Sequence, residues 1–384
     1  MFRRPSIVAA LAVAVLWLCQ FATVRYNYAG NWTGLFCIAP HMPVPDFLRS
    51  ERLYIFQGSE GYDGQIFHLI AHDPWMRRGS AAAIGGAKFR YQRIFVPALA
   101  WILALGRDEY IHAAYFAVIL GFACGGVYWL ARLALLRQLA PWWGLAFIAV
   151  PATITSIDLM TADVALAAFC VGFVLYAEEA RFLPILAVLT SAALTRETAA
   201  LIVAGYVLYL LSRRQFGQAI AAACTVLPAG LWFLYVSHGA MRSEAVNYVN
   251  WVPLYGFVER LLHSVAYALP DWKTHIAILF DYLALLGIAL MFLAMIRMAA
   301  ARRWNPTTSA IYTLALATVF LRSADVWADA YNFGRVLSPL LLLTFLEDLR
   351  KRPLAALAPM ILIDLRISLN LIGQLEGIVR GLLK

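Results

Sequence analysis

Long apolar runs alternate with short polar stretches along most of the chain, a pattern typical of helices that cross a bilayer. A spanning helix needs about 20 apolar residues, at a rise of about 1.5 Å each. One apolar stretch, residues 182–211, is interrupted by Thr195-Arg-Glu-Thr198 and predicts two short helices that meet at a polar break. The pattern predicts an all-α, polytopic transmembrane helical bundle of about eleven spans, a single integral membrane domain over residues 1–384. The other runs near spanning length are residues 6–24, 110–130, 142–157, 159–177, 216–236, 275–296, 307–321, 333–346 and 354–372.

Basic residues gather in alternate loops between these runs and indicate an orientation. Short cytoplasmic loops of membrane proteins are rich in Lys and Arg, so we expect the N-terminus and these loops to be cytoplasmic. The start Met1-Phe-Arg-Arg-Pro5 precedes the apolar run 6–24, and no small-residue cleavage site follows, which predicts an uncleaved signal anchor. The basic residues of the predicted inner loops are Arg132, Arg137, Arg181, Arg213, Arg214, Arg297, Arg302, Arg303, Arg350, Lys351 and Arg352.

In this orientation, residues 25–109 form one long outer loop. Its apolar part, 94–106, is too short to cross comfortably and carries Pro97, so we expect an interfacial or re-entrant helix there. A second outer loop covers residues 237–274. The break at 195–198 and the polar stretch 322–335 face the same side, so polar groups from distant parts of the chain should converge on one face of the membrane.

Composition supports a membrane protein and excludes other classes. The chain is 62% hydrophobic and 14% charged, whereas a soluble domain carries about a quarter charged residues. The net charge of +9 follows from the loop pattern, and no basic run interleaved with polar sequence predicts a nucleic-acid partner. The five cysteines lack the spacing of a zinc site or of a disulfide framework.

Asp63 stands in Glu60-Gly-Tyr-Asp-Gly-Gln65, at the start of an amphipathic stretch in the outer loop. An ionised carboxylate beside the bilayer can accept a proton from an attacking hydroxyl group. Gly61 and Gly64 would let backbone or substrate approach closely. The alternative is that Asp63 is a plain N-cap for a helix over 64–72. Position 66 is isoleucine, so no capping box reinforces that alternative.

His68 and His72 lie four residues apart and share one face of the predicted helix. With Asp63 they would form a divalent metal site or help to bind an acidic head group. Because no clear third ligand accompanies them, the sequence assigns no metal ligands, and a divalent cofactor is left open.

Arg90 and Arg93, together with Lys88 and Tyr91, form a compact cationic cluster before the short apolar helix. The rigid fork of donors in a guanidinium group suits phosphate oxygens. The alternative is attraction to anionic lipid head groups. Both interpretations imply a phosphate group, and they differ in whether it belongs to a substrate.

Arg196 and Glu197 interrupt an apolar hairpin, and Arg335 follows Asn332-Phe-Gly at the start of another run. Ionisable groups at membrane depth usually face a cavity or each other. A simple structural ion pair between Arg196 and Glu197 is the alternative.

The segment Tyr62-Asp63-Gly64-Gln65-Ile66-Phe67-His68-Leu69-Ile70-Ala71 follows a first span and places an early acid in an aromatic context. This arrangement resembles the GT-C superfamily of polytopic glycosyltransferases. Mannosyltransferases of the PIG-V type and related bacterial enzymes similarly follow the acid with an aromatic–proline segment, and Arg93-Ile-Phe-Val-Pro97 stands at that position. The chain departs from the pattern in two respects: the usual tryptophan is Tyr62, and only one acid fits the motif cleanly.

The resemblance implies inverting transfer of a sugar from a polyprenyl-phosphate carrier to a glycan, lipid or protein acceptor. The reaction would take place at the periplasmic face of a bacterial inner membrane, with Asp63 as the general base. A transporter or flippase of lipid-linked sugars is the alternative from another class, although no inverted repeat is visible. A non-catalytic membrane protein is a further alternative. The candidate substrate-binding residues, chosen by location, are Tyr62, Gln65, His68, Arg90, Arg93, Arg196, Glu197 and Arg335.

Overall fold

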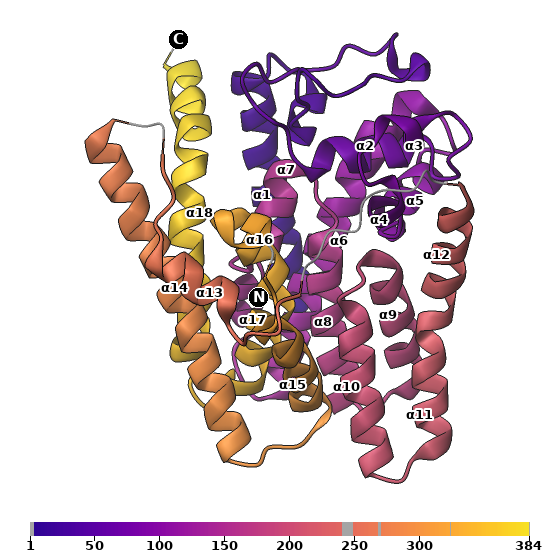
Figure 1. The fold of residues 1–384 in the computed structure, drawn as a ribbon, viewed down its shortest axis with the longest axis vertical. Coiled ribbons are helices and arrows are strands. Elements are labelled where there is room, and N and C mark those ends of the chain that lie inside the picture. Colours follow the sequence, from indigo (N-terminus) through magenta and orange to yellow (C-terminus); the bar gives the residue numbers. More distant parts are fainter. Residues whose placement is uncertain (1–3, 240–248, 268–269, 323, 384) are drawn as a thin grey trace.

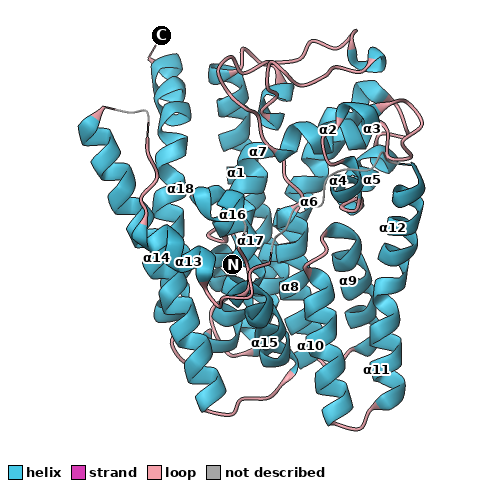
Figure 2. Cartoon of the chain, viewed as in Figure 1, coloured by secondary structure: helices cyan, strands magenta, loops and turns pink. Residues whose placement is uncertain are grey.

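The computed structural model describes residues 4–239, 249–267, 270–322 and 324–383. Within these ranges the chain consists of helices and connecting loops, with isolated bridges at Ile38–Ile55 and Val249–Leu321 (Figure 2). The predicted all-α class is therefore confirmed for the described residues.

Five helical segments of the described part are long and apolar enough to cross a bilayer. A sixth would be the pair η3 (Pro141–Phe147) and α7 (Pro151–Leu159), which is bent by 60° at its break. These segments fit an integral membrane protein, but the predicted count of about eleven spans is not confirmed. The five segments are α1 (Pro5–Asn27), α6 (Asp108–Leu136), α14 (Asp271–Ala300), α18 (Pro353–Leu382) and Phe216–Gly239, which comprises α11 (Phe216–Ala223), the turn η4 (Cys224–Val226) and α12 (Leu227–Gly239).

The other apolar runs also fold as helices, but they do not combine the length and hydropathy of a span. The 16 residues of α8 extend for about 24 Å, less than the hydrocarbon core of about 30 Å. Nearly every residue of α8 is buried, so its hydrophobicity serves packing inside the bundle. The predicted break at 195–198 is present between α9 and α10. These helices are α8 (Asp163–Glu178), α9 (Phe182–Thr195), α10 (Ala199–Ser212), α15 (Pro306–Val319) and α17 (Ala330–Asp348).

Residues 28–107 connect α1 to α6 and lie over one end of the bundle, at the top of Figure 1. We call this stretch the 28–107 segment. The apolar part predicted over 94–106 folds as the short helix α5 (Phe95–Leu103). The predicted loop 237–274 contains α13 (Tyr255–Leu262), while its residues 240–248 and 268–269 lie outside the described residues. The remaining short elements are η1 (Trp32–Phe36), η2 (Asp46–Leu48), α2 (Asp63–His72), α3 (Ser80–Ala83), α4 (Ala87–Tyr91) and α16 (Ala324–Ala328).

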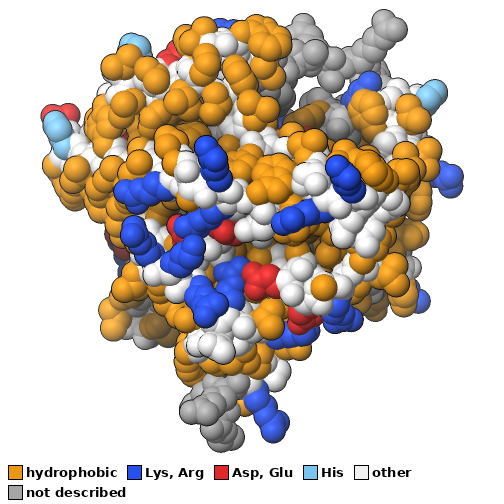
Figure 3. Space-filling model, turned by 90° about the horizontal axis from the view of Figure 1, so that it is seen from below, with side chains coloured by type: hydrophobic (Ala, Val, Ile, Leu, Met, Phe, Trp, Pro, Cys, Tyr) orange, Lys and Arg blue, Asp and Glu red, His pale blue; other side chains and the backbone are white. Residues whose placement is uncertain are grey.

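Basic side chains gather at the opposite end of the bundle. The loops from α10 to α11 and from α14 to α15 lie at the bottom of Figure 1, and Lys and Arg side chains cluster on the face seen from below (Figure 3). Ion pairs join neighbouring helix ends there: Arg303 lies 2.6 Å from Asp348, and Arg137 donates to Glu178. The two ends of the bundle thus differ in character, with a folded segment at one and short basic loops at the other.

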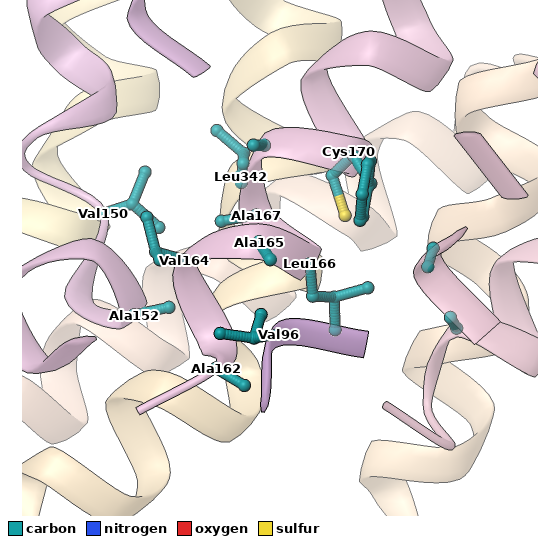
Figure 4. Packing of buried hydrophobic residues seen from close by; sticks show 14 of the residues in the cluster. Val96, Val150, Ala152, Ala162, Val164, Ala165, Leu166, Ala167, Cys170 and Leu342 are labelled. Carbon is teal, nitrogen blue, oxygen red and sulfur yellow. The ribbon is translucent and has the colours of Figure 1, made fainter. Parts of the chain in front are cut away.

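Small side chains let the central helices approach closely. Val164, Ala165 and Ala167 of α8 pack in the interior against residues of α5, α7 and α17, including Val96 and Leu342 (Figure 4). Close van der Waals packing of small residues is a main source of helix association inside a bilayer. The first residue of this packed helix, Asp163, is itself buried.

Candidate functional site

Asp63 is the first residue of α2, and its carboxylate is held by arginines from other elements. Arg90 of α4 donates to Oδ1 at 2.8 Å, and Nη1 of Arg335 in α17 lies 2.7 Å from Oδ2. Tyr62 occupies the N-cap position, and its side chain makes no capping bond. The alternative assignment of Asp63 as a plain N-cap of a helix over 64–72 is therefore wrong, because the helix starts at Asp63 and the carboxylate binds guanidinium groups instead.

Gly64 allows α2 to begin against the end of α7. A Cβ atom built at Gly64 would lie 3.0 Å from the Phe36 carbonyl oxygen and still closer to the carbonyl oxygen of Leu159, the last residue of α7. Gly61 has a φ of +74°, in the region where a side chain is strained. The two glycines thus allow the tight backbone path at the start of α2, in agreement with the close approach of backbone that the sequence predicts.

Arg93 joins the 28–107 segment to the break between α9 and α10. Its guanidinium group makes two hydrogen bonds to the Glu197 carboxylate, at 2.8 and 3.1 Å, and stacks 4.5 Å from the centre of the Phe89 ring. The second charge at the break, Arg196, is ion-paired with Asp163 at the start of α8. Arg196 and Glu197 lie 3.9 Å apart, but each has a nearer partner elsewhere in the fold, so the two are not an isolated pair.

Arg335 stands at the centre of the charged groups. Besides its 2.7 Å contact with Asp63, its guanidinium group lies 3.6 Å from Asp163 and 4.9 Å from the centre of the Tyr62 ring. The Tyr62 hydroxyl donates to Asn332 of α17 at 2.8 Å. One charged cluster thus joins α2, α4, α8, α17 and the α9–α10 break. We call it the Asp63 cluster: Asp63, Arg90, Arg93, Asp163, Arg196, Glu197 and Arg335.

The Asp63 cluster contains four guanidinium groups and three carboxylates, so it carries one excess positive charge when all are ionised. Burial by itself would raise the pKa of Asp63, but the charges of Arg335, Arg90 and Arg93 outweigh it and lower that pKa well below its usual range. Asp63 is consequently a carboxylate at neutral pH.

Several buried donors of the Asp63 cluster form no hydrogen bond with the described residues. The Nε atoms of Arg196 and Arg335 are shielded from solvent and form no hydrogen bond within the described part of the chain. A buried donor without a partner is costly. An excess positive charge with unused N–H groups is the arrangement that binds an anion such as phosphate.

The structure brings together seven of the nine residues predicted for the site: Tyr62 and the Asp63 cluster without Asp163. Gln65 does not join the Asp63 cluster. Its side-chain carbonyl accepts a hydrogen bond from the backbone N–H of Ala39 at 2.9 Å and so binds the loop that follows η1. His68 belongs to a separate cluster described below. Asp163 was not among the predicted site residues, although its place near the outer start of the run 159–177 was visible in the sequence.

The second cluster forms around His68 and His72, two buried residues of α2. The Nε2 atom of His68 lies 2.7 Å from that of His112 in α6 and 3.2 Å from that of His72. Oε2 of Glu51 lies 3.2 Å from Nε2 of His112. We call these residues the histidine cluster. Glu51 and His112, rather than Asp63, complete the group that the spacing of His68 and His72 suggested.

Burial and neighbouring charges set the ionisation of these imidazoles. Burial lowers the pKa of His68 well below its usual value, and the adjacent His72 and His112 lower it further. Burial also lowers the pKa of His72, although its hydrogen bond to Asp108 and the charge of Glu51 oppose the shift. Both rings are thus neutral near pH 7.

Comparisons with protein-family models, with curated proteins and with solved structures find no match to this chain. The function is accordingly argued from the residues of the site.

Proposed function

We propose that the chain is a polytopic membrane glycosyltransferase that moves a sugar from a polyprenyl-phosphate carrier to an acceptor hydroxyl group. The proposal names Asp63 as the general base and the arginines of the Asp63 cluster as the phosphate-binding groups. The observation that carries it is the contact of one acid with guanidinium groups from separate elements, Arg90 in α4 and Arg335 in α17, with Arg93 and Arg196 adjoining.

The resemblance to GT-C glycosyltransferases supports the same assignment. Its motif places an early acid after the first span, and in this fold that acid, Asp63, is the one bound by the arginines. The aromatic–proline segment contributes Arg93, which reaches both Glu197 and the neighbourhood of Asp63. The segments that carry the resemblance thus contribute Asp63 and Arg93 to the cluster.

A phosphate would change the state of Asp63 as it binds. In the structure the Asp63 carboxylate is a weak base, because two guanidinium groups neutralise it at 2.7–2.8 Å. The donor phosphate would compete for Arg90 and Arg335 and would thereby raise the basicity of Asp63. This coupling would make Asp63 an effective base only when the donor is present.

The chemical step is a single displacement. The acceptor oxygen forms a bond to the anomeric carbon of the sugar while the bond from that carbon to the phosphate oxygen breaks. The acceptor proton passes to Asp63, and the electron pair leaves with the polyprenyl phosphate, whose added charge the arginines stabilise. One displacement inverts the anomeric configuration.

The orientation that suits this reaction places the basic loop end in the cytoplasm and the 28–107 segment in the periplasm, within a bacterial inner membrane. The positive-inside rule supports this direction, because Arg213, Arg214, Arg302 and Arg303 lie in short loops. The lipid tail of the donor would remain among the apolar helices, and the acceptor, whether a glycan, a lipid or a protein, would approach from the aqueous side.

The test uses the purified chain in bilayers that contain polyprenyl-phosphate sugars and candidate acceptors. Asp63→Asn should lower the transfer rate by about 10²–10⁴-fold, the usual contribution of a general base. Glu60→Gln is the matched control, since the Glu60 side chain is 96% exposed and lies three residues away. It should leave the rate unchanged.

The result also separates the enzyme from its rivals. Movement of lipid-linked sugar between leaflets, without transfer to any acceptor, would identify a flippase. Equal transfer by wild type and Asp63→Asn would remove Asp63 from the mechanism.

A further inference from the structure

The histidine cluster has the composition of a metal centre and lies apart from the Asp63 cluster. Glu51, His68, His72 and His112 each offer one ligand atom, and these atoms all lie within 4.8 Å of one another. We propose that these four side chains bind one divalent first-row transition metal ion, zinc by preference, which fixes α2 against α6. The proposal goes beyond sugar transfer and does not depend on it.

The distances suit tetrahedral coordination. Zinc lies about 2.0–2.1 Å from imidazole nitrogen, so the ligand atoms of a tetrahedral site stand about 3.3 Å apart. The Nε2 atoms of His68 and His72 are 3.2 Å apart, as are Nε2 of His112 and Oε2 of Glu51. The Nε2 atoms of His68 and His112 are 2.7 Å apart. Nε2 of His68 lies 3.9 Å from Oε2 of Glu51, and Nε2 of His72 lies 3.7 Å from Oε1. All four ligand atoms lie within 4.8 Å of one another, so the widest separations would have to close, by rotation of the side chains, around a metal at their centre.

The surroundings of His72 select the tautomer that binds a metal. Its Nδ1 atom lies 2.8 Å from Oδ1 of Asp108, so the ring donates a proton there and Nε2 keeps a lone pair. Arg78 holds Asp108 in turn with two hydrogen bonds of 2.7 Å. A carboxylate behind a ligating histidine is the usual outer shell of a zinc site.

A cation would also resolve the contacts inside the histidine cluster. Both carboxylate oxygens of Glu51 are shielded from solvent and accept no hydrogen bond from the described residues. A proton on Nε2 of His68 can be shared with only one neighbouring ring at a time. A metal ion at the centre would contact all three nitrogens and the Glu51 carboxylate at once.

The ligand set identifies the class of metal. Magnesium and calcium prefer oxygen ligands, whereas three imidazoles and one carboxylate suit zinc and its neighbours in the first transition row. Four protein ligands close a tetrahedral shell, which is characteristic of a structural rather than a catalytic ion. A cavity of about 720 Å³, lined in part by Glu51, His112 and Trp32, adjoins the histidine cluster and provides a route for the ion.

The structural role follows from the elements that the ligands join. Glu51 comes from the loop after η2, His68 and His72 from α2, and His112 from the first turns of α6. The ion would therefore fasten the loop and α2 to the long helix α6. His68 lies on the same ten-residue helix as Asp63, so the metal would hold that helix while taking no part in the chemistry.

The first experiment measures the metal content of the chain purified in detergent with a tag that contains no histidine. Elemental analysis should give about one zinc per chain for the wild type. His72→Ala should lose the metal, and His41→Ala should retain it, because the His41 side chain is 62% exposed in the same segment. Asp63→Asn should retain the metal as well, which keeps this test separate from that of sugar transfer.

A second measurement does not depend on whether the His72→Ala variant folds. Wild-type chain stripped with a chelator and loaded with Co²⁺ should show the intense visible absorption of a tetrahedral site, and zinc should displace it. Asp108→Asn keeps all four ligands and should weaken zinc binding by about 10–100-fold. Wild type with less than about a tenth of an equivalent of bound metal, and no cobalt spectrum, would overturn the proposal. Full metal content in His72→Ala would overturn it as well.

Discussion

At the scale of single residues, the most buried members of the Asp63 cluster depend on neutralisation of their charges by one another. The side chains of Arg93, Arg196 and Asp163 are between 7% and 9% exposed, so each charge needs its partner. Removal of one partner from such a pair leaves an uncompensated buried charge, which is more costly than the pair is favourable. The order of the site therefore depends on these buried partners being ionised together.

Asp63 should give the chain a measurable acid dependence. Its pKa is lowered in the folded state, so the stability that it contributes is present above the unfolded value of about 3.9 and is lost as the pH falls through the folded value. We expect the melting temperature of wild type to exceed that of Asp63→Asn at pH 7. The difference should shrink only below about pH 4.

The measurement is thermal unfolding in detergent between pH 3 and 7. Asp46→Asn provides the control, since the Asp46 side chain is 88% exposed. This variant should melt at the same temperature as wild type at pH 7. A difference that already disappears between pH 7 and 5 would contradict the lowered pKa of Asp63.

At the scale of elements, α2 is a short helix whose two ends are both held by close contacts. Its first turn lies against the carbonyl groups of Phe36 and Leu159, and its last residue, His72, lies in the histidine cluster. Ten residues cannot stabilise a helix alone in water. The contacts at its two ends therefore determine where α2 stands.

Gly64→Ala should displace the start of α2. The added methyl group meets backbone atoms that cannot rotate away, and overpacking of this kind costs about 1–3 kcal/mol. We expect a lower melting temperature and a lower rate of sugar transfer. Gly85→Ala is the control, because a Cβ atom at Gly85 meets nothing within 4 Å. Equal behaviour of the two variants would show that α2 tolerates the shift.

At the scale of the whole molecule, the chain has two unlike ends. The 28–107 segment, which contributes residues to both polar clusters, lies at one end, and short basic loops lie at the other (Figures 1 and 3). Under the positive-inside rule, this difference specifies the direction of insertion.

The orientation can be tested with single cysteines in a chain whose five natural cysteines are replaced by serine. We expect a membrane-impermeant maleimide to label Glu60→Cys in intact cells, since that side chain is 96% exposed in the 28–107 segment. Arg213→Cys, in the exposed loop between α10 and α11, should react only after the membrane is opened. The opposite result would reverse the proposed orientation.

The sequence predicted the helical class and the residues of the Asp63 cluster better than it predicted the spans. Polar residues in apolar surroundings are costly unless they meet, so Arg196 and Arg335 could be expected to face other charges. Hydropathy alone cannot separate a spanning helix from a short helix buried by its neighbours, and α8 was therefore counted as a span. Glu51 and His112 were missed because their nearness to His68 arises only from the folding of the 28–107 segment against α6.

The register of α2 links the two clusters. Asp63 begins the helix, and His68 and His72 follow it by five and nine residues. A helix turns by about 100° per residue, so one inserted or deleted residue between Asp63 and His68 would swing one cluster away from its partners. A change in the length of α2 would therefore disturb a whole cluster, whereas a substitution removes one contact. Over evolutionary time, the number of residues between Asp63 and His72 should therefore stay constant even where the other residues of α2 change.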